Sequence, residues 1–103
     1  MAKGYWIGHV TVTEPDSYAK YVEANGPVFA KWGARFLVRG GQHQAVEGPA
    51  RDRHVILEFD SYQKALNCYH SPEYQEVFKL SKDAGIADIM IVEVCQTLER
   101  RAN

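Results

Sequence analysis

The sequence predicts an α+β domain in which a four-stranded antiparallel sheet carries its helices on one face. The chain has 103 residues, of which 46% are hydrophobic, and this is enough for one compact core. Alternating and helically spaced apolar segments follow one another in the order β-α-β-β-α-β. Two helices are too few to cover both faces of such a sheet. We therefore expect a single domain over residues 1–103, with its core at about 3–98 and a flexible tail at 99–103.

The first part of the chain contains two predicted strands and a long predicted helix. Residues 5–12 alternate between two faces, as the residues of a half-buried strand do. Thr13 is predicted to cap the helix that follows, whose apolar stripe reaches Gly33. Pro27 lies inside this stripe and should kink the helix, because proline lacks a backbone donor. The second strand is expected at residues 34–39.

The second part of the chain contains one further helical region and two strands. Residues 42–53 are ambiguous, because a short strand and a turn both fit them. Asp60 or Ser61 is expected to cap a helix, and Ser71 is expected to cap its continuation. The remaining predicted strands cover residues 54–59 and 86–98.

One face of the predicted sheet has no helix to cover it. In the phase that places Trp6 on the helix side, the opposite face carries many apolar side chains. They are Tyr5, Ile7, Leu37, Ile56, Ile89 and Ile91, and the polar residues among them are His9, Arg39, His54, Glu58 and Glu93. An apolar patch of this kind is usually covered by a partner. Pairing two copies face to face gives a homodimer with a barrel-like centre.

Charge and cysteine use limit the partners and the compartment. A net charge of −1 gives the surface no bulk attraction to nucleic acid or to an anionic membrane. The first residues lack the apolar stretch of an export signal, and no segment has the roughly 18 unbroken apolar residues of a membrane span. Cys68 and Cys95 show no CxxC spacing. We expect both thiols to be reduced in a cytoplasmic protein.

Five segments together carry a family resemblance. They are Gly4-Tyr5-Trp6-Ile7, Gly33-Ala34-Arg35-Phe36-Leu37-Val38-Arg39-Gly40-Gly41, Val46-Glu47-Gly48, Val55-Ile56-Leu57-Glu58-Phe59 and Cys68-Tyr69-His70-Ser71-Pro72-Glu73-Tyr74-Gln75. In this order and spacing, the chain resembles the domain-of-unknown-function family thirteen-thirty of the dimeric α/β-barrel superfamily, over residues 3–94. The resemblance implies a ferredoxin-like fold and a homodimer whose two sheets form a barrel. It implies no activity, because that family has no established one.

Arg39 and Glu58 are the first candidates for chemistry. Arg39 stands beside Gly40, where an open backbone lets the guanidinium bind a carboxylate through two hydrogen bonds. The alternative is an ion pair with Glu47, Glu58 or the partner chain. Glu58 lies in an apolar strand and would act as a general base if burial raised its pKa. The alternative there is a structural pair with Arg35 or Arg39.

The histidines and the helical tyrosines are the second group of candidates. His9 and His54 share the bare face, where a neutral imidazole can act as a proton shuttle or a ligand, or can simply be solvated or lie in an interface. Tyr69 and Tyr74 can line a pocket between the helices and the sheet for a flat apolar ligand, and ordinary core packing is the alternative. No HxxxH, HExxH, GxGxxG or Walker pattern is present, so neither a metal site nor a cofactor is predicted.

Three functions fit these patterns. The first, which we favour, is a homodimeric small-molecule-binding domain with a pocket near the sheet. Its predicted ligand contacts are Arg39, Gly40, Glu47, His54, Tyr69 and Tyr74. The second is a cofactor-independent oxygenase or isomerase of the kind found in other dimeric α/β-barrel families, in which Glu58 or His9 removes a proton and Arg39 stabilises the oxyanion. The third is an assembly module without a ligand, whose polar sheet residues set the register of the dimer.

Overall fold

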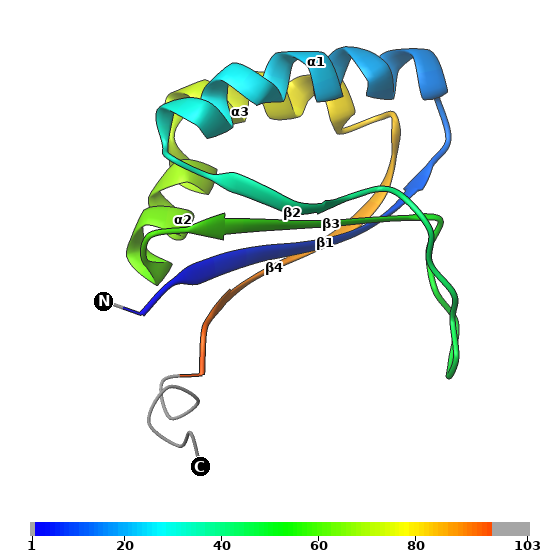
Figure 1. The fold of residues 1–103 in the computed structure, drawn as a ribbon. Helices are drawn as coiled ribbons and strands as arrows, with labels where there is room; N and C mark the ends of the chain where they lie inside the picture. Colours follow the sequence, from blue (N-terminus) through cyan, green and yellow to red (C-terminus); the bar gives the residue numbers. More distant parts are fainter. Residues whose placement is uncertain (1, 96–103) are drawn as a thin grey trace.

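The computed structural model describes residues 2–95 and has one sheet with helices on one side of it (Figure 1). Its four strands are all antiparallel to their neighbours and lie in the order β2-β3-β1-β4. The elements are β1 (Gly4–Val12), α1 (Pro15–Lys31), β2 (Arg35–Arg39), β3 (Arg53–Phe59), α2 (Tyr62–His70), α3 (Pro72–Ser81) and β4 (Gly85–Glu93). The predicted α+β class, the order of the elements and the antiparallel sheet are confirmed, and the second helical region forms two helices.

Local sequence explains two of the helix starts, and a long-range contact explains the third. The hydroxyl oxygens of Ser61 and Ser71 accept hydrogen bonds from the backbone of α2 and α3, as predicted for N-caps. The prediction for Thr13 is wrong, because the N-cap of α1 is Glu14 and no side chain caps it. The backbone N–H groups of Thr13 and Glu14 instead donate to the carbonyl of Ala84, just before β4. The start of α1 is therefore tied to the other end of the chain.

The core lies between the sheet and the helices and is centred on Trp6 of β1. The Trp6 ring packs edge-on against Phe29 of α1 and Tyr74 of α3, with centroids 5.1 and 5.0 Å away. Its indole N–H donates to the carbonyl of Ala65 in α2, at 2.9 Å. One residue thus joins the central strand to all three helices, and Cys68 is fully buried in the same cluster. The helix side of the sheet is the side that the alternation of β1 predicts.

An irregularity in β2 changes which side chains face the helices. The pairing of β2 with β3 shifts between Phe36 and Val38, so that Leu37 is an extra residue in the strand. Val38 therefore lies opposite Ile56 on the helix-free face, and Arg39 lies opposite Val55 on the helix side. The sequence alternation had placed Arg39 on the helix-free face, and the bulge makes that assignment wrong.

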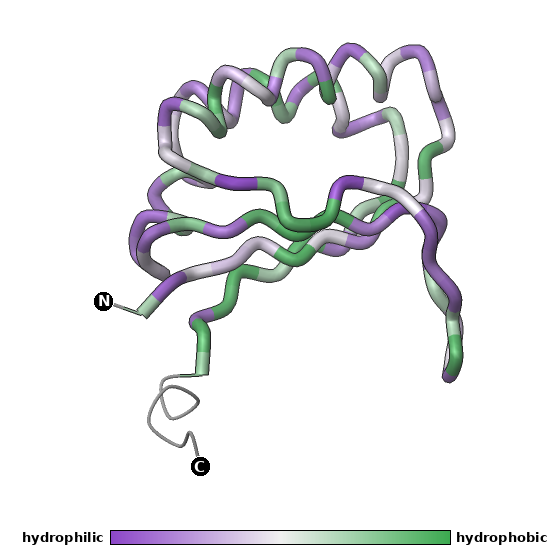
Figure 2. The backbone as a smooth tube through the Cα atoms, in the orientation of Figure 1, coloured by the Kyte–Doolittle hydropathy of each residue, from purple (hydrophilic) through white to green (hydrophobic). Residues whose placement is uncertain are grey.

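The register of β4 corrects three more positions. Ile89 pairs with Gly8, Ile91 with Trp6 and Glu93 with Gly4, so all three lie on the helix side rather than on the helix-free face. Met90 and Val92 take their place on the helix-free face. The apolar run at residues 89–92, part of which is visible in green in Figure 2, does not reveal the phase, because the polar residues at its two ends, Asp88 and Glu93, lie on opposite faces.

The connection between β2 and β3 is an exposed segment that extends away from the sheet (Figure 1). Residues 41–50 are all exposed, and the segment contains neither a helix nor a strand. The short strand considered for this region is therefore not formed. Within residues 2–95, no helix has the length and apolar character needed to cross a membrane.

Candidate functional site

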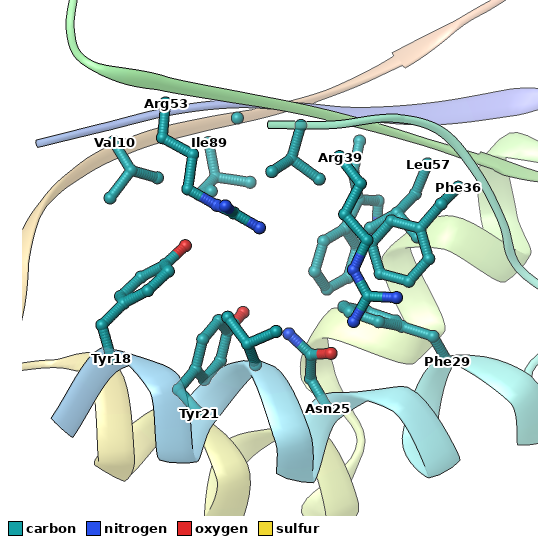
Figure 3. A pocket seen from close by; sticks show the side chains of 14 residues that line it. Val10, Tyr18, Tyr21, Asn25, Phe29, Phe36, Arg39, Arg53, Leu57 and Ile89 are labelled. Atoms are coloured by element: carbon teal, nitrogen blue, oxygen red, sulfur yellow. The ribbon is translucent and has the colours of Figure 1, made fainter. Parts of the chain in front are cut away.

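A pocket lies between α1 and the helix side of the sheet (Figure 3). Arg39 and Arg53 extend from the strands toward α1, and Tyr18, Tyr21 and Asn25 extend from α1 toward the sheet. The rest of the lining is apolar and comes from Trp6, Gly8, Val10, Val22, Phe29, Phe36, Val55, Leu57 and Ile89. The pocket therefore combines aromatic walls with two cationic side chains.

Arg39 enters this pocket because of the bulge in β2. Its guanidinium carbon lies 4.0 Å from the centroid of the Phe36 ring, within the range of a cation–π contact. Neither Glu47 nor Glu58 forms an ion pair with it, and no acidic side chain does so among residues 2–95. The ion pairs considered for Arg39 within the chain are thus absent from this part of the structure.

Arg53 is the first residue of β3 and reaches the same pocket. Its guanidinium carbon lies 5.6 Å from the ring centroid of Tyr18, and its Nε atom is buried without a hydrogen-bond acceptor. A Cβ atom on Gly40 would lie 3.0 Å from Nη1 of Arg53, and Gly40 has a φ of +75°. Glycine at this position therefore supplies both the turn after Arg39 and the space for the second guanidinium.

Asn25 adds an unsatisfied polar group to the pocket. The residue is 5% exposed, and its Oδ1 atom is buried without a donor. Figure 3 shows its amide beside the guanidinium of Arg39. Buried polar atoms are nearly always hydrogen-bonded, so two orphans in one pocket, on Asn25 and on Arg53, mark a place where a polar partner is missing.

A second cavity of about 200 Å³ adjoins the first, which has about 40 Å³. The two cavities share Val10, Tyr18, Tyr21 and Ile89 in their walls. The second is also lined by Tyr69, Tyr74, Phe78, Ser81, Lys82, Gly85 and Ala87. Tyr69 and Tyr74 thus line a cavity between the helices and the sheet, at the place where sequence analysis put them.

Two tyrosine hydroxyls meet at the wall of the second cavity. The hydroxyl oxygens of Tyr21 and Tyr74 are 2.8 Å apart and share a hydrogen bond. Burial raises the pKa of both phenols above the ordinary value of 10.0. Both groups therefore stay protonated at neutral pH and act as hydrogen-bond donors or acceptors, not as bases.

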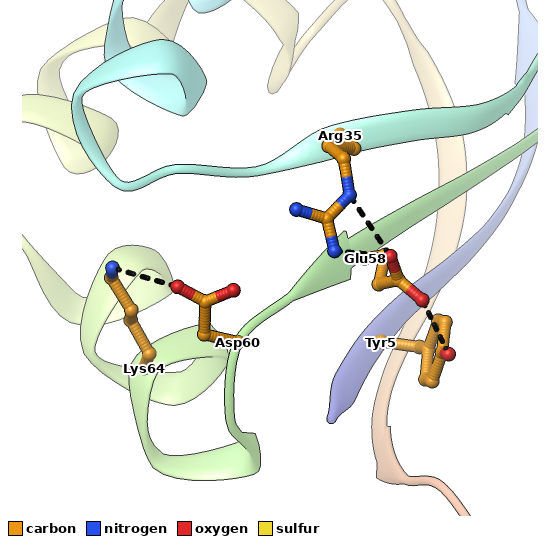
Figure 4. A network of polar contacts seen from close by, with 5 residues as sticks. All are labelled: Tyr5, Arg35, Glu58, Asp60 and Lys64. Atoms are coloured by element: carbon orange, nitrogen blue, oxygen red, sulfur yellow. Dashed lines mark hydrogen bonds and ion pairs between the residues drawn. The ribbon is translucent and has the colours of Figure 1, made fainter. Parts of the chain in front are cut away.

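Glu58 lies on the helix-free face, inside a polar network (Figure 4). The hydroxyl of Tyr5 donates to its Oε2 at 2.7 Å, and Nε of Arg35 donates to its Oε1 at 3.0 Å. The hydrogen bond from Tyr5 and then the bonds and charge of Arg35 hold the pKa of Glu58 below its ordinary value of 4.5. This is the structural pairing with Arg35 that was considered for Glu58, and a lowered pKa makes a weaker base.

The two histidines that were singled out also lie on the helix-free face. The Nδ1 atoms of His9 and His54 are 2.8 Å apart, and the ring of His43 lies 4.6 Å from that of His54. In β4, Asp88 faces His9 across the strand pair and accepts a hydrogen bond from Arg51 at 2.8 Å. No group of three such side chains within residues 2–95 has the geometry to hold a metal ion.

The predicted site residues therefore separate into two groups. Arg39, Tyr69 and Tyr74 line the two cavities on the helix side, and Gly40 lies beside Arg53. Glu58, His9 and His54 lie across the sheet from them, and Glu47 lies in the exposed segment between β2 and β3. The structure does not bring these two groups together within one chain.

The sequence of this chain places it in a family. The sequence profile of that family matches residues 3–95, which is most of the chain. The chain belongs to the family described as Domain of unknown function (DUF1330). The resemblance inferred from the sequence is thereby confirmed. No curated protein matches the sequence.

Solved structures similar to this DUF1330 chain share its fold at low sequence identity. A protein of unknown function from Rhodopseudomonas palustris has a TM-score of 0.75 and 19% identity, over 91% of this chain and 83% of that one. A dimeric ferredoxin-like protein of unknown function from Thermobifida fusca has a TM-score of 0.63 and 11% identity, over 90% and 92% of the two chains. SnoaB, a cofactor-independent oxygenase from Streptomyces nogalater, has a TM-score of 0.63 and 11% identity, over 95% and 98%. These similarities show the ferredoxin-like fold.

Arg53, Asn25 and Tyr21 line the pocket and were missed as site residues; a signal was available for the first two. Arg53 is two residues before Val55 and four before Leu57, so the alternation of β3 already places a charged residue on the helix side. Asn25 likewise falls on the apolar stripe of α1. A polar side chain on an apolar face was the available signal in both cases. Their convergence with Arg39 could not be seen, because it depends on the bulge in β2.

Proposed function

We propose that this protein is a homodimeric small-molecule-binding domain whose pocket, between α1 and the sheet, takes a small organic anion with an apolar body. The observation that carries this proposal is the pair of guanidinium groups of Arg39 and Arg53, which line an aromatic pocket without an acidic partner among residues 2–95. A charge beside apolar walls is costly unless it is paired. A carboxylate on a ligand would supply the missing pair.

Arginine suits this task because its planar group donates two parallel hydrogen bonds to a carboxylate. Nε of Arg53 is a buried donor that still lacks an acceptor. The rings of Phe36 and Tyr18 lie against the guanidinium groups of Arg39 and Arg53, and a hydrogen bond beside such apolar surface is stronger than one in water. The first cavity, of about 40 Å³, has room for a head group of a few atoms, and the adjoining cavity of about 200 Å³ has room for a compact body.

The dimer is part of the proposal because the helix-free face is apolar and uncovered. Met90 is 63% exposed and Ile86 is 54% exposed, and both lie on this face in β4. A second copy of the chain is the occupant that we propose. Support comes from the ferredoxin-like protein of Thermobifida fusca, which is described as dimeric and shares this fold.

Binding is a better fit than catalysis for the cavities that the structure describes. The fold similarity to SnoaB favours a cofactor-independent oxygenase as the second candidate. Such a reaction needs a base near the substrate. Among the described residues that line the two cavities there is no carboxylate and no imidazole, and the phenols of Tyr21 and Tyr74 have raised pKa values. Chemistry using Glu58 or His9 would have to take place on the helix-free face.

The experiment compares two arginines of the same strand. Calorimetric titration with benzoate, and with neutral benzyl alcohol, is carried out on the wild type, Arg39→Ala and Arg35→Ala. We expect Arg39→Ala to weaken benzoate binding by about 10-fold to 100-fold, which corresponds to one lost charge-assisted interaction. Arg35→Ala removes the same charge from the helix-free face and should leave the affinity unchanged.

Two outcomes would contradict the proposal. Equal benzoate affinity in the wild type and Arg39→Ala would show that the pocket does not bind the anion. Tighter binding of benzyl alcohol than of benzoate would show that charge does not matter. Native mass spectrometry of each variant reports whether the dimer is retained, so that a loss of binding through dissociation is recognised.

A further inference from the structure

We infer that the ligand has a second polar end: an acceptor oxygen, such as an aromatic ketone or aldehyde carbonyl, that receives a hydrogen bond from the Tyr21–Tyr74 hydroxyl pair. The ligand class is then an aromatic acid with a carbonyl group at a distance from its carboxylate. This inference rests on the proposed function, because it presumes that the carboxylate binds at Arg39 and Arg53.

The two cavities are arranged so that one ligand can occupy both. They share four lining residues, and Tyr21 is one of them. The arginines line only the first cavity, whereas Tyr74 lines only the second. A ligand held by its carboxylate in the smaller cavity therefore extends past Tyr21 into the larger one. Its far end then meets the hydroxyl pair.

The walls of the second cavity select a flat ligand. Tyr69, Tyr74 and Phe78 line it, and the rings of Tyr69 and Phe78 lie 5.4 and 6.4 Å from the ring of Tyr74, measured between centroids. Aromatic surfaces of this kind contact a planar apolar body over a large area. A flexible aliphatic chain would lose more conformational entropy on entering the same space.

The donor count of the hydroxyl pair points to an acceptor on the ligand. Each phenol carries one O–H proton, and the bond between Tyr21 and Tyr74 uses only one of the two protons. The second proton takes no part in that bond. The pair therefore has one donor left for the cavity.

The unused hydroxyl of the Tyr21–Tyr74 pair keeps its proton, and so remains a hydrogen-bond donor, at neutral pH. Burial raises the pKa of both hydroxyls, so neither becomes a phenolate in the physiological range. Tyr74 is 2% exposed, and bulk water has little access to its hydroxyl. A donor in such a place discriminates strongly between a ligand that accepts its bond and a ligand of equal shape that does not.

The test uses pairs of ligands that differ only in the acceptor. Calorimetry compares 3-acetylbenzoate and 4-acetylbenzoate with 3-isopropylbenzoate and 4-isopropylbenzoate, which have nearly the same shape. In the wild type, we expect at least one acetyl compound to bind about tenfold more tightly than its isopropyl counterpart. In the double variant Tyr21→Phe/Tyr74→Phe, the ratio should fall to about one. Tyr62→Phe is the matched control, because Tyr62 lies outside the walls of both cavities, and it should keep the wild-type ratio.

A second measurement covers a double variant that fails to fold. The infrared band of a ¹³C-labelled acetyl carbonyl moves to lower frequency when the oxygen accepts a hydrogen bond, and it is recorded for the ligand bound to the wild type. A shift supports the inference, and a bound carbonyl with the frequency found in an aprotic solvent overturns it.

Failure of the inference differs from failure of the proposed function. If benzoate binds and needs Arg39, but neither acetyl compound is preferred over its isopropyl counterpart, then only the second polar end is wrong. If no benzoate derivative binds to the wild type, the proposed function fails and this inference fails with it. A ratio near ten that persists in the double variant would place the acceptor contact elsewhere and overturn the role of the hydroxyl pair.

Discussion

Arginine side chains on the two faces of the sheet have different interaction partners. Arg35 and Arg39 belong to the same five-residue strand, β2. On the helix-free face, Arg35 is half exposed and yet pairs with Glu58. On the helix side, Arg39 stacks on Phe36 and has no acidic partner among the described residues. Both arginines are exposed residues of β2, so the ion pair of Arg35 does not follow from a difference in hydration.

The difference separates a structural role from a binding role. The pair on the helix-free face is complete, since Glu58 accepts from both Arg35 and Tyr5. The helix side is incomplete, since Arg53 and Asn25 each keep a buried atom without a partner. A buried polar group without a hydrogen bond lowers the stability of the folded protein. A ligand that forms this hydrogen bond removes that cost, and the gain contributes to its binding free energy.

The largest expected effect is on the helix side, at its central residue. Trp6→Ala should lower the free energy of unfolding by about 3–5 kcal/mol, because it opens a cavity and leaves the carbonyl of Ala65 without its donor. Urea denaturation measures the loss. Tyr5→Phe is the control on the adjacent position of the opposite face, and it should cost no more than about 1.5 kcal/mol. A smaller loss for Trp6→Ala than for Tyr5→Phe would show that the core is not centred where the structure places it.

The next largest effect is on the apolar part of the helix-free face. Met90→Lys puts a charge on the surface that we propose to be covered by a second copy, and it should weaken the dimer by about 100-fold or more. Met90 is exposed in the single chain, so the fold of each protomer should be unchanged. Analytical ultracentrifugation measures the association, and circular dichroism measures the fold. Met90→Leu is the control and should remain dimeric. A wild type that sediments as a monomer, or a Met90→Lys variant that stays dimeric, would contradict this use of the face.

Most of the fold could be predicted from local patterns, because each helix and strand has its own periodicity. Ser61 and Ser71 identified two helix starts, since N-caps act within one turn. The start of α1 was mistaken at Thr13, because the contact with Ala84 lies far away in the sequence. The site was harder to predict. One extra residue in β2 moves Arg39 to the other face, and nothing in the alternation of Phe36, Leu37 and Val38 marks that irregularity.

The smallest expected effect is at the ion pair of the helix-free face, and it depends on pH. The pKa of Glu58 is lowered from 4.5, so its ionised form stabilises the fold above that pH. The stabilisation should decrease as the pH falls through 4.5 and disappear below the lowered pKa, where Glu58 is protonated in both states. Glu58→Gln should therefore lower the melting temperature by a few degrees at neutral pH, and the difference should shrink steadily as the pH falls below 4.5.

Thermal unfolding of the wild type and Glu58→Gln across this range measures the difference. Glu73→Gln is the matched control, because Glu73 has a lowered pKa from its pairing with Lys31 but lies in α3, away from the sheet. Each variant removes one carboxylate, so their effect on overall charge is the same. The same variants test a role of this network in the dimer. If Glu58→Gln weakens the dimer at neutral pH and Glu73→Gln does not, the network of Tyr5, Arg35 and Glu58 also sets the register between the two copies. A melting difference for Glu58→Gln that stays constant down to low pH would show that the carboxylate charge is not what the network uses.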